Sequence, residues 1–473
     1  MSTWDYTPLI AELSEALSER FPRSAAIQRD ACRFLLDGGS HTIRLIRPFP
    51  PRIVSARGGR VRDEDGHDIL DFWQGHMANV LGHNPEVVTA ELARAFAAGF
   101  GLQVGMTDRL QAEVAEILCR QTGADRVRLT TSGTLAGMYG VLLARAFTGR
   151  DLVLKVGGGW HGAHPWSLKG FRYHAEPGVG FGAVDTDGLP ARFTDDVIVT
   201  AFNDPQDLAD VFEIYGDKLA CFVVEPVIGA GGMIPATRDY LALARRLTHR
   251  HGALLIVDEV ITGFRFRAGN VAPLYGIEGD LAVYAKAIGG GMPVAALAGR
   301  DDVMSLAGRA RGNRVAVQGG TFCEHPASLL AAKVFMSYLV EHEAEVYGSL
   351  AELGRKMRDA MTAGFADEGI LAVCTGDSPD LPAGSSLGMV HFPYSEDTTI
   401  NTPQAVFDPA VCDVELRTEV LGAAMLLEGV HLVQGHGSAA TAHTDEDMER
   451  LKHACRAVAR RVKPHMSDRR RHG

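Results

Sequence analysis

The stretch Leu281-Ala-Val-Tyr-Ala-Lys286-Ala-Ile-Gly-Gly-Gly291 places a lysine directly after a short apolar segment and before three glycines. A similar junction occurs upstream, where Asp258 follows the apolar run Ala253-Leu-Leu-Ile-Val257. Short apolar runs with such boundaries are typical of buried strands. The sequence therefore predicts that an amine and a carboxylate close two strands, 286 − 258 = 28 residues apart.

The region around these two strands repeats one pattern. From about residue 84 to 310, short apolar runs alternate with longer segments of helical periodicity. This alternation predicts an α/β fold with a largely parallel sheet that helices cover on both faces. The predicted strands are 127–131, 152–156, 197–200, 219–224, 254–257 and 281–284, and helices between them include 135–147 and 240–251.

The two ends of the chain follow other patterns. Their predicted elements are a helix at 8–36, strands at 52–57, 61–66 and 69–73, and a helical stretch at about 326–364 that precedes a mixed α+β end. We therefore expect an N-terminal helix with small strands (1–75), a large domain (76–312) and a small C-terminal domain (313–473).

Composition limits the kinds of protein that this chain can be. Of its 473 residues, 46% are apolar and 22% are charged, and the net charge of −11 argues against a nucleic-acid-binding surface, which would be basic. Seven cysteines without a C-x-x-C pair predict reduced thiols. No apolar run approaches the roughly 18 residues of a membrane span, and Met1–Tyr6 lacks the features of a secretory signal. We expect a cytoplasmic protein without membrane or nucleic-acid partners.

Ser132-Gly133-Thr134 follows the predicted strand 127–131 and precedes a helix. Free backbone N–H groups, a hydroxyl and the positive end of the helix dipole suit such a turn to a phosphate. Ordinary capping of the helix by Ser132 or Thr134 is the alternative interpretation.

Three glycines and a tryptophan follow the strand 152–156, in Gly157-Gly158-Gly159-Trp160-His161-Gly162. Glycines allow the backbone to approach a ligand closely, and the ring of Trp160 could stack on a planar cofactor. A flexible loop with a half-buried tryptophan is the alternative.

Asp258 and Lys286 are predicted to be buried or partly buried, and each would then need a particular chemical partner. A carboxylate buried after a strand needs a cation or a donor, which a pyridinium N–H or Arg265 could provide. A partly desolvated lysine has a lowered pKa and is a better nucleophile, although most lysines at strand ends extend to solvent. Pyridoxal 5′-phosphate (PLP) uses both groups, because a lysine forms a Schiff base with it and a carboxylate keeps its ring nitrogen protonated.

The histidine pairs 161/164 and 249/251 have no further ligands at recognisable metal spacing, and no H-E-x-x-H motif occurs. We therefore expect no metal site.

Together these motifs resemble the class III, fold type I PLP-dependent aminotransferases. The similarity is strongest to the subgroup that contains glutamate-1-semialdehyde aminomutase and the aminotransferases of β-amino acids and aryl-glycines. The matching stretches are Ser132-Gly-Thr134, Trp160-His-Gly162, Phe202-Asn-Asp-Pro205, Val224-Glu-Pro-Val227, Asp258-Glu-Val-Ile-Thr-Gly-Phe-Arg265, Ala285-Lys-Ala-Ile-Gly-Gly-Gly-Met-Pro293 and Gly319-Gly-Thr-Phe322. The resemblance covers about residues 35–450. It implies a large, mostly parallel α/β/α sandwich domain and a smaller α+β domain formed by the C-terminus with the N-terminal segment.

The resemblance implies a role for each residue around the cofactor ring. Lys286 would hold the cofactor (PLP, or its amine form PMP) as a Schiff base and later move the proton between substrate and cofactor. Asp258 would pair with the pyridine nitrogen. Val260 would pack on one ring face and Trp160 on the other, where the family usually has Tyr or Phe.

The resemblance also implies contacts to the cofactor's substituents. Ser132, Gly133 and Thr134 would bind the phosphate, and Thr321 would reach the phosphate of a partner subunit, so that a homodimer shares its active sites. Asn203 would lie near the phenolic oxygen of the cofactor, and Glu225 would line the site.

Several departures from the family pattern concern the substrate. Leu135 stands where the family commonly has Glu, and the stretch 433–444 lacks the acidic gate residue of the aminomutase. His436 stands nearest the place where related aminotransferases often have an arginine. Arg44 resembles an N-terminal arginine that binds a substrate carboxylate in some relatives, with a surface ion pair as its alternative. We expect Trp73 to line the substrate pocket, and Gln74 and His76 to shape it.

The sequence therefore predicts an aminotransferase that moves an amino group between small molecules, from an amino acid or amine to a keto acid or aldehyde. An intramolecular 2,1-aminomutase is the main alternative. Racemisation, decarboxylation or elimination on the same scaffold, or a catalytically silent PLP-binding protein, are the others.

Overall fold

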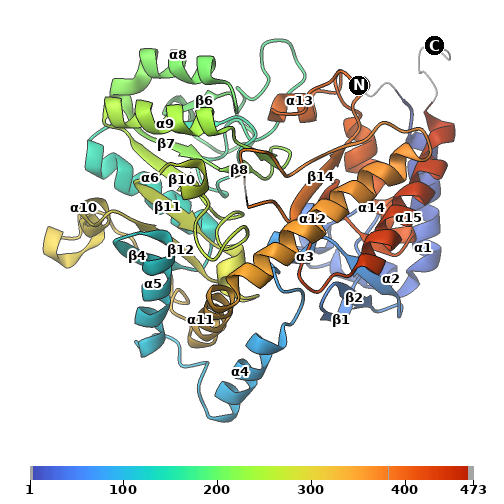
Figure 1. The fold of residues 1–473 in the computed structure, drawn as a ribbon, viewed down its shortest axis with the longest axis horizontal. Coiled ribbons are helices and arrows are strands. Elements are labelled where there is room, and N and C mark those ends of the chain that lie inside the picture. The colour runs from blue at the N-terminus through green and yellow to red at the C-terminus, as the bar shows by residue number, and fades with distance from the viewer. Residues whose placement is uncertain (1–3, 382, 467–473) are drawn as a thin grey trace.

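A computed structural model describes residues 4–381 and 383–466 of the chain. Its central element is a seven-stranded sheet with the strand order β4-β12-β11-β10-β7-β5-β6, in the left half of Figure 1. These strands are β4 (Arg126–Thr130), β5 (Leu152–Val156), β6 (Val197–Thr200), β7 (Leu219–Val224), β10 (Leu254–Asp258), β11 (Leu281–Tyr284) and β12 (Ala295–Gly299). All six strands predicted from the sequence are present.

One strand of this sheet was not predicted. β12 runs antiparallel to both of its neighbours, β11 and β4, whereas the other adjacent pairs of the sheet are parallel. Its sequence, Ala295-Ala-Leu-Ala-Gly299, lacks the β-branched residues that mark the other strands. Because β4 and β11 both oppose β12, they run in the same direction.

Helices cover both faces of the sheet, as the alternating pattern predicts. Side chains alternate in direction along a strand: in β10, Leu255 and Val257 pack in one apolar core, and Leu254 and Ile256 pack in another. The first core includes α8 and α9 and the second includes α6. The helices on this part of the chain are α4 (Glu86–Ala97), α5 (Arg109–Thr122), α6 (Gly133–Thr148), α7 (Ala191–Asp195), α8 (Pro205–Tyr215), α9 (Arg238–His251), α10 (Asp301–Met304) and α11 (Pro326–Glu341).

The two ends of the chain fold together into a second body of the molecule. β15 (Val430–His431) pairs in parallel with β3 (Asp68–Asp71), so the C-terminal part completes the sheet β1-β2-β3-β15 begun by β1 (Ile53–Arg57) and β2 (Arg60–Asp63). One apolar core contains side chains from residues 6–72 and 353–462. The remaining elements here are α1 (Thr7–Arg20), α2 (Pro22–Ala31), α12 (Glu343–Ala366), β13 (Val373–Thr375), β14 (Leu387–His391), α13 (Pro403–Phe407), α14 (Leu421–Leu427), β16 (His436–Ser438) and α15 (Asp445–Val462).

Each of the two long helices predicted from the sequence is observed as a pair of shorter helices. The predicted helix 8–36 breaks at Phe21, because Pro22 begins α2 and cannot continue the hydrogen bonding of α1. The helical stretch 326–364 breaks at His342, which separates α11 from α12. α11 packs in a core with strand residues of the large sheet, whereas α12 packs against α15 of the second body. The three-part division of the chain stays a prediction.

Arg265 connects the two bodies. Its fully buried guanidinium, on the loop after β10, donates hydrogen bonds to the carbonyl oxygens of Met77 and Ala439 and to the hydroxyls of Ser386 and Ser438. The alternative in which Arg265 pairs with Asp258 is therefore wrong.

Three sequence expectations concern absences. All seven cysteines are free thiols. Within residues 4–381 and 383–466, no helix is long and apolar enough to cross a membrane. The same part of the chain holds no cluster of three or more side chains that could bind a metal ion.

Candidate active site

Five of the predicted site residues lie at one edge of the seven-stranded sheet. β4, β5, β7, β10 and β11 all run in the same direction, so their carboxyl ends meet at that edge. Ser132, Trp160, Glu225, Asp258 and Lys286 follow or close these five strands in that order. Ligands of open α/β sheets bind at this edge. We call these residues and their neighbours Gly133, Thr134 and Val260 the cofactor wall.

Lys286 has an unusual backbone and an unusual environment. It begins the 3₁₀ turn Lys286–Gly289 with a φ of 52°, in the left-handed region that side chains rarely adopt. Burial lowers the pKa of Lys286 to about 8, and the negative charges of Glu225 and Asp258 oppose this shift. A sizeable fraction of its amine is therefore the neutral nucleophile near neutral pH.

Asp258 is buried and hydrogen-bonded on both carboxylate oxygens. One oxygen lies 2.7 Å from Nδ1 of His161, and the other accepts a hydrogen bond of 3.0 Å from the backbone N–H of Val260. Because the first contact needs a donor, Nδ1 of His161 carries its proton toward the carboxylate. Asp258 thus has a histidine partner that fixes its orientation.

The turn 132–134 has the geometry of an anion site. The Ser132 hydroxyl caps α6 by accepting a hydrogen bond of 3.3 Å from the N–H of Leu135, so the capping interpretation is correct as well. Gly162 packs directly on this turn with a φ of 104°, and a Cβ there would lie 2.5 Å from Cα of Thr134. The N–H groups of the first turn of α6 have no acceptor within the helix. These N–H groups are therefore available to a phosphate at this turn, and the phosphate role of the turn stays a prediction.

The residues predicted to enclose a planar ring are suitably placed. Val260 packs on Gly133, where a Cβ would lie 2.9 Å from Cγ2 of Val260. The Trp160 side chain is 41% exposed, and its ring meets Phe171 edge-on at 5.0 Å between centroids. The ring of Trp160 is therefore accessible to a ligand. The cofactor wall thus fits PLP on three counts: a phosphate turn, a ring-binding carboxylate and a nucleophilic amine.

Glu225 supports the loop that carries Trp160. Its carboxylate accepts hydrogen bonds from the N–H groups of Trp160 (3.3 Å) and Gly229 (3.0 Å). Burial, together with the nearby negative charge of Asp258, raises the pKa of Glu225 to about 7.

Two predicted cofactor residues have other surroundings. The side-chain oxygen of Asn203 accepts from the N–H of Thr237, and its amide nitrogen donates to the carbonyls of Pro235 and Asn401. A contact from Asn203 to the cofactor would require one of these bonds to break. Thr321 is exposed to solvent. Both roles stay predictions.

A second group of residues lies near Lys286, because the segment Gln74–Met77 contacts the turn Lys286–Gly289, and we call it the substrate wall. The Trp73 ring lies 4.4 Å from the ring of His76 and 6.1 Å from that of His436, and His41 lies 5.2 Å from His76. Burial lowers the pKa of His76 to about 2, with the charges of Lys286 and Arg44 adding to the effect. Burial also lowers the pKa of His436 to about 4. The imidazoles of His76 and His436 are therefore neutral at pH 7.

Arg44, the remaining member of the substrate wall, is an exposed residue in the 3₁₀ turn Thr42–Arg44. Burial is the largest cause that lowers the pKa values of His41 and His76, and the positive charge of Arg44 lowers both further. Since His76 lies beside Trp73, Arg44 provides a cation near the substrate wall.

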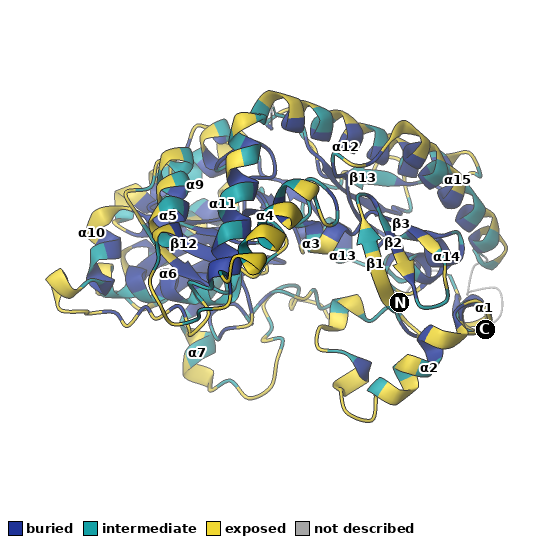
Figure 2. Cartoon of the chain, turned by 90° about the horizontal axis from the view of Figure 1, so that it is seen from below, coloured by how far each residue is buried: buried dark blue, intermediate teal, exposed yellow. Residues whose placement is uncertain are grey.

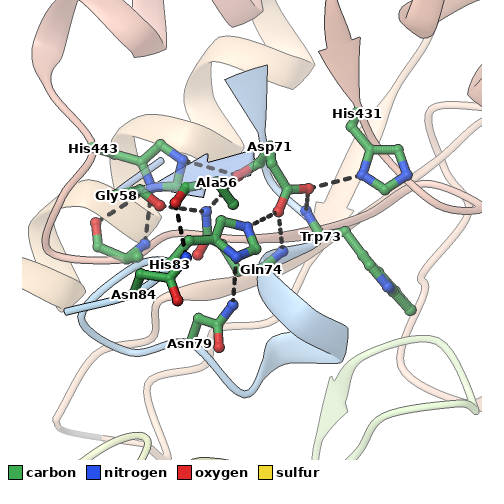
Figure 3. Close-up of polar contacts among 11 residues, drawn as sticks. Ala56, Gly58, Asp71, Trp73, Gln74, Asn79, His83, Asn84, His431 and His443 are labelled. Carbon is green, nitrogen blue, oxygen red and sulfur yellow. Dashed lines mark hydrogen bonds and ion pairs between the residues drawn. The ribbon is translucent and has the colours of Figure 1, made fainter. Parts of the chain in front are cut away.

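The backbone of the substrate wall is in an uncommon conformation. Gln74, Gly75, His76 and Met77 all have φ values between 45° and 67°. Figure 3 shows what holds this segment: the Asp71 carboxylate accepts hydrogen bonds from the N–H groups of Trp73 (2.9 Å) and Gln74 (3.0 Å).

Histidines from distant parts of the chain complete the partners of Asp71. Nε2 of His83 lies 2.7 Å from the carboxylate and Nδ1 of His431 lies 2.8 Å from it. The amide nitrogen of Gln74 donates to the carbonyl oxygen of Asp71 at 2.8 Å, and the role of Gln74 in shaping the pocket stays a prediction.

The family model for class III aminotransferases matches residues 46–369 of the chain. The chain belongs to the class III aminotransferase family. This family consists of PLP-dependent enzymes, and the cofactor wall supplies the groups that PLP requires.

Two relatives of the chain are named as aminomutases. The glutamate-1-semialdehyde 2,1-aminomutase of Haloarcula marismortui is 30% identical over 445 residues, which span 90% of this chain and 97% of the relative. The enzyme of the same name from Halobacterium salinarum is 35% identical over 338 residues, spanning 70% and 73% of the two chains.

Solved structures of the family include transaminases with the same fold. An omega-transaminase from Sphaerobacter thermophilus superposes with a TM-score of 0.83 at 28% identity, covering 93% of this chain and 98% of that one. A β-phenylalanine aminotransferase from Variovorax paradoxus has a TM-score of 0.82 at 27% identity and covers 98% of both chains. The class III member described here therefore has the fold type I architecture.

Sequence reasoning missed two residues that organise the site. His161 was recognised only as part of the Trp160-His-Gly162 motif and as a rejected metal ligand, although it is the partner of Asp258. Asp71 was missed entirely. A carboxylate that closes a predicted strand, as Asp71 closes β3, was the available signal, since Asp258 was found in that way.

Proposed function

We propose that this class III enzyme is an aminotransferase that moves an amino group from an amino acid or amine to a keto acid or aldehyde. The observation that carries the proposal is the placement of Lys286, Asp258 and the turn 132–134 at the carboxyl ends of three strands of one sheet. When bound, PLP supplies the carbonyl that takes up the amino group and the ring that delocalises negative charge.

Lys286 has two proposed tasks in this reaction. Its amine attaches the resting cofactor, and after release it moves a proton between the substrate carbon and C4′ of the cofactor. A pKa of about 8 suits both tasks, because the amine can accept and return a proton near neutral pH. Asp258 holds the pyridine nitrogen in its protonated form, and His161 orients that carboxylate.

The substrate wall supports transfer to an external acceptor. The loop 433–444 brings the neutral ring of His436 beside Trp73 and lacks the acidic gate residue of the aminomutase. In this proposal Arg44 binds a substrate carboxylate, and Trp73, His76 and His436 contact the rest of the substrate.

An intramolecular 2,1-aminomutase is the second candidate. The aminomutase names of the relatives at 30–35% identity favour it. Such an enzyme would start from the amine form of the cofactor, deliver that amine to the substrate and recover the substrate's original amine, so it would need no external donor.

Nitrogen transfer separates the two candidates. The enzyme in its PLP form is mixed with each member of a panel of amino donors, and the cofactor spectrum reports conversion to the amine form. An aminotransferase converts stoichiometrically with a good donor and passes a ¹⁵N label to an added keto acid or aldehyde. Isomerisation of a substrate by the amine form without any added donor, and with no ¹⁵N passed to an added keto acid or aldehyde, contradicts the proposal and supports the mutase.

We also propose a homodimer that shares its active sites. Thr321, predicted to reach a partner's cofactor phosphate, is exposed beside Phe322, whose side chain is 57% exposed. Phe96, Leu102 and Met106, at and after the end of the largely exposed helix α4, are exposed as well (Figure 2). Apolar exposure of this kind marks an interaction surface. The free cysteines are consistent with the proposed cytoplasmic location.

A further inference from the structure

A small cavity lies behind the cofactor-binding carboxylate. It has a volume of about 10 Å³ and is lined by the side chains of Lys155, His161, His164, Trp166 and Asp258, together with apolar residues. This volume is close to the smallest that holds one water molecule. Because the contact between His161 and Asp258 uses Nδ1, Nε2 of His161 needs a different partner.

Three nitrogen atoms on the residues that line this cavity lack a partner. Nε2 of His161, Nδ1 of His164 and Nε1 of Trp166 are buried and have no hydrogen-bond partner among the residues that the structure describes. A buried polar atom without a hydrogen-bond partner destabilises the folded state. Three of them around one cavity indicate a shared polar ligand.

The chemistry of these nitrogens defines that ligand. Nε2 of His164 lies 3.1 Å from the carbonyl oxygen of His161, so it must be the protonated nitrogen of this ring. Burial lowers the pKa of His164 to about 4, which leaves its Nδ1 a bare acceptor at pH 7. The indole N–H of Trp166 can only donate. A ligand that accepts from Trp166 and donates to His164, in the space of one water, is water itself.

Lys155 holds the segment that carries these rings. Its buried ammonium donates to the carbonyl oxygens of Gly159 (3.0 Å), Ser167 (3.2 Å) and Lys169 (2.8 Å). These three bonds use all its protons, so Lys155 closes the cavity wall without competing for its contents. The segment 159–169 that forms part of the cavity wall is therefore held in place by three hydrogen bonds.

We propose that one ordered water in this cavity joins Trp166 and His164 to Nε2 of His161, and that Trp166 and His164 thereby position Asp258 for the cofactor. Water can donate or accept at Nε2, so His161 stays fully hydrogen-bonded whether its ring is neutral or charged. The inference rests on the proposed pairing of Asp258 with the pyridine nitrogen.

A crystal structure of the PLP-loaded enzyme tests the water directly. We expect a water oxygen within about 2.7–3.2 Å of all three nitrogens. A cavity without a water, or a water that contacts fewer than two of them, overturns the proposal. This result does not depend on what Asp258 binds, so it separates the water site from the proposed function.

A double-mutant cycle tests the positioning role through PLP affinity, measured by absorbance titration of the apoenzyme. Trp166→Phe keeps the ring and removes the donor, and we expect the Kd for PLP to rise about fivefold to tenfold, the range for one lost buried hydrogen bond. His161→Asn keeps an N–H for Asp258 and loses the cavity-side nitrogen. In that background we expect Trp166→Phe to change the Kd by less than about twofold.

The double-mutant cycle has outcomes that would overturn the positioning role, and it has a matched control. Equal effects of Trp166→Phe in both backgrounds would show that Trp166 acts through packing alone, which overturns the positioning role. Tyr6→Phe removes one buried aromatic donor, bonded to Asp413 at 2.6 Å in the other body, and should leave the Kd unchanged. Asp258→Asn should raise the Kd; if it does not, the proposed function fails while the water remains testable. Should Trp166→Phe not fold, the crystal structure of the wild-type enzyme decides the proposal.

Discussion

The cofactor wall and the substrate wall lie near each other but are held in place by different means. Residues of the cofactor wall come from the carboxyl ends of five strands of one sheet that run in the same direction, so the strand order of the sheet brings them together. The substrate wall depends on a left-handed segment, Gln74–Met77, that stays in place because Asp71 accepts four hydrogen bonds. The first wall is therefore a product of the fold, whereas the second depends on one buried charge.

Replacing the lysine of the cofactor wall should have the largest effect on activity. We expect Lys286→Ala to lower turnover by at least about 10²–10⁴-fold, because a positioned acid–base group is lost. The absorbance of lysine-bound cofactor should vanish as well, while the unfolding transition stays cooperative. Lys333→Ala, which removes a lysine paired with Glu113, should retain wild-type turnover. Substantial activity in Lys286→Ala would refute the assignment of the cofactor wall.

Removing the charge behind the substrate wall should have the largest effect on stability. We expect Asp71→Asn to lower the free energy of unfolding by about 3–5 kcal/mol at pH 7, measured by urea denaturation, since His83 and His431 lose a buried anionic partner. Asp68→Asn on the same strand, whose partner Arg60 lies at the surface, should cost less than about 1 kcal/mol. Similar losses in the two variants would show that the left-handed segment does not depend on Asp71.

The contribution of Asp71 should also depend on pH. Burial alone would raise its pKa, but hydrogen bonds from His431 and His83 outweigh burial and hold the pKa of Asp71 well below its ordinary value. Its stabilisation is thus complete above the unfolded pKa of about 3.9 and is lost as pH falls toward the folded pKa. The stability difference between wild type and Asp71→Asn should therefore shrink below about pH 4. A constant difference from pH 7 to pH 3 would contradict the ion-pair explanation.

A change within the substrate wall should separate substrate binding from cofactor binding. We expect His436→Asn to raise KM for the best donor roughly threefold to tenfold, because the ring that packs on Trp73 is lost, with little change in the cofactor spectrum. His453→Asn, on the exposed side of α15, serves as the control. If the spectrum changed as much as KM, the two walls would not be independent.

The smallest expected effect concerns the phosphate turn. Ser132→Ala removes the cap of α6 and should cost about 1 kcal/mol in unfolding free energy. Thr237→Ala removes the cap of α9 and should cost about the same. Only Ser132→Ala should also weaken PLP retention in dialysis; equal retention in both would reduce Ser132 to a capping residue.

The two walls also differ in how far sequence predicts them. Asp258 and Lys286 follow short apolar runs, so their positions at strand ends could be read locally, whereas Glu225 and Val260 were identified only through the family resemblance. The Asp258–His161 contact spans 97 residues and the Asp71–His431 contact spans 360, and no local pattern encodes such pairs. The left-handed backbone at Gln74, His76 and Met77 could not be predicted either, because side chains ordinarily avoid it. β12 was missed because its residues are small.

Arg265 has a consequence for how such an enzyme could be altered. It follows Asp258 by seven residues and holds the carbonyl oxygen of Met77, the last residue of the left-handed segment, as well as Ser438 and Ala439 beyond His436. Redesigning the backbone of the loop around Ser438 and Ala439 to accept a new amine would therefore disturb Arg265. Since Arg265 follows Asp258 on the same loop, the position of Asp258 would change as well. Directed evolution of specificity in this chain should succeed most readily at side chains, with the main-chain anchors of Arg265 left in place.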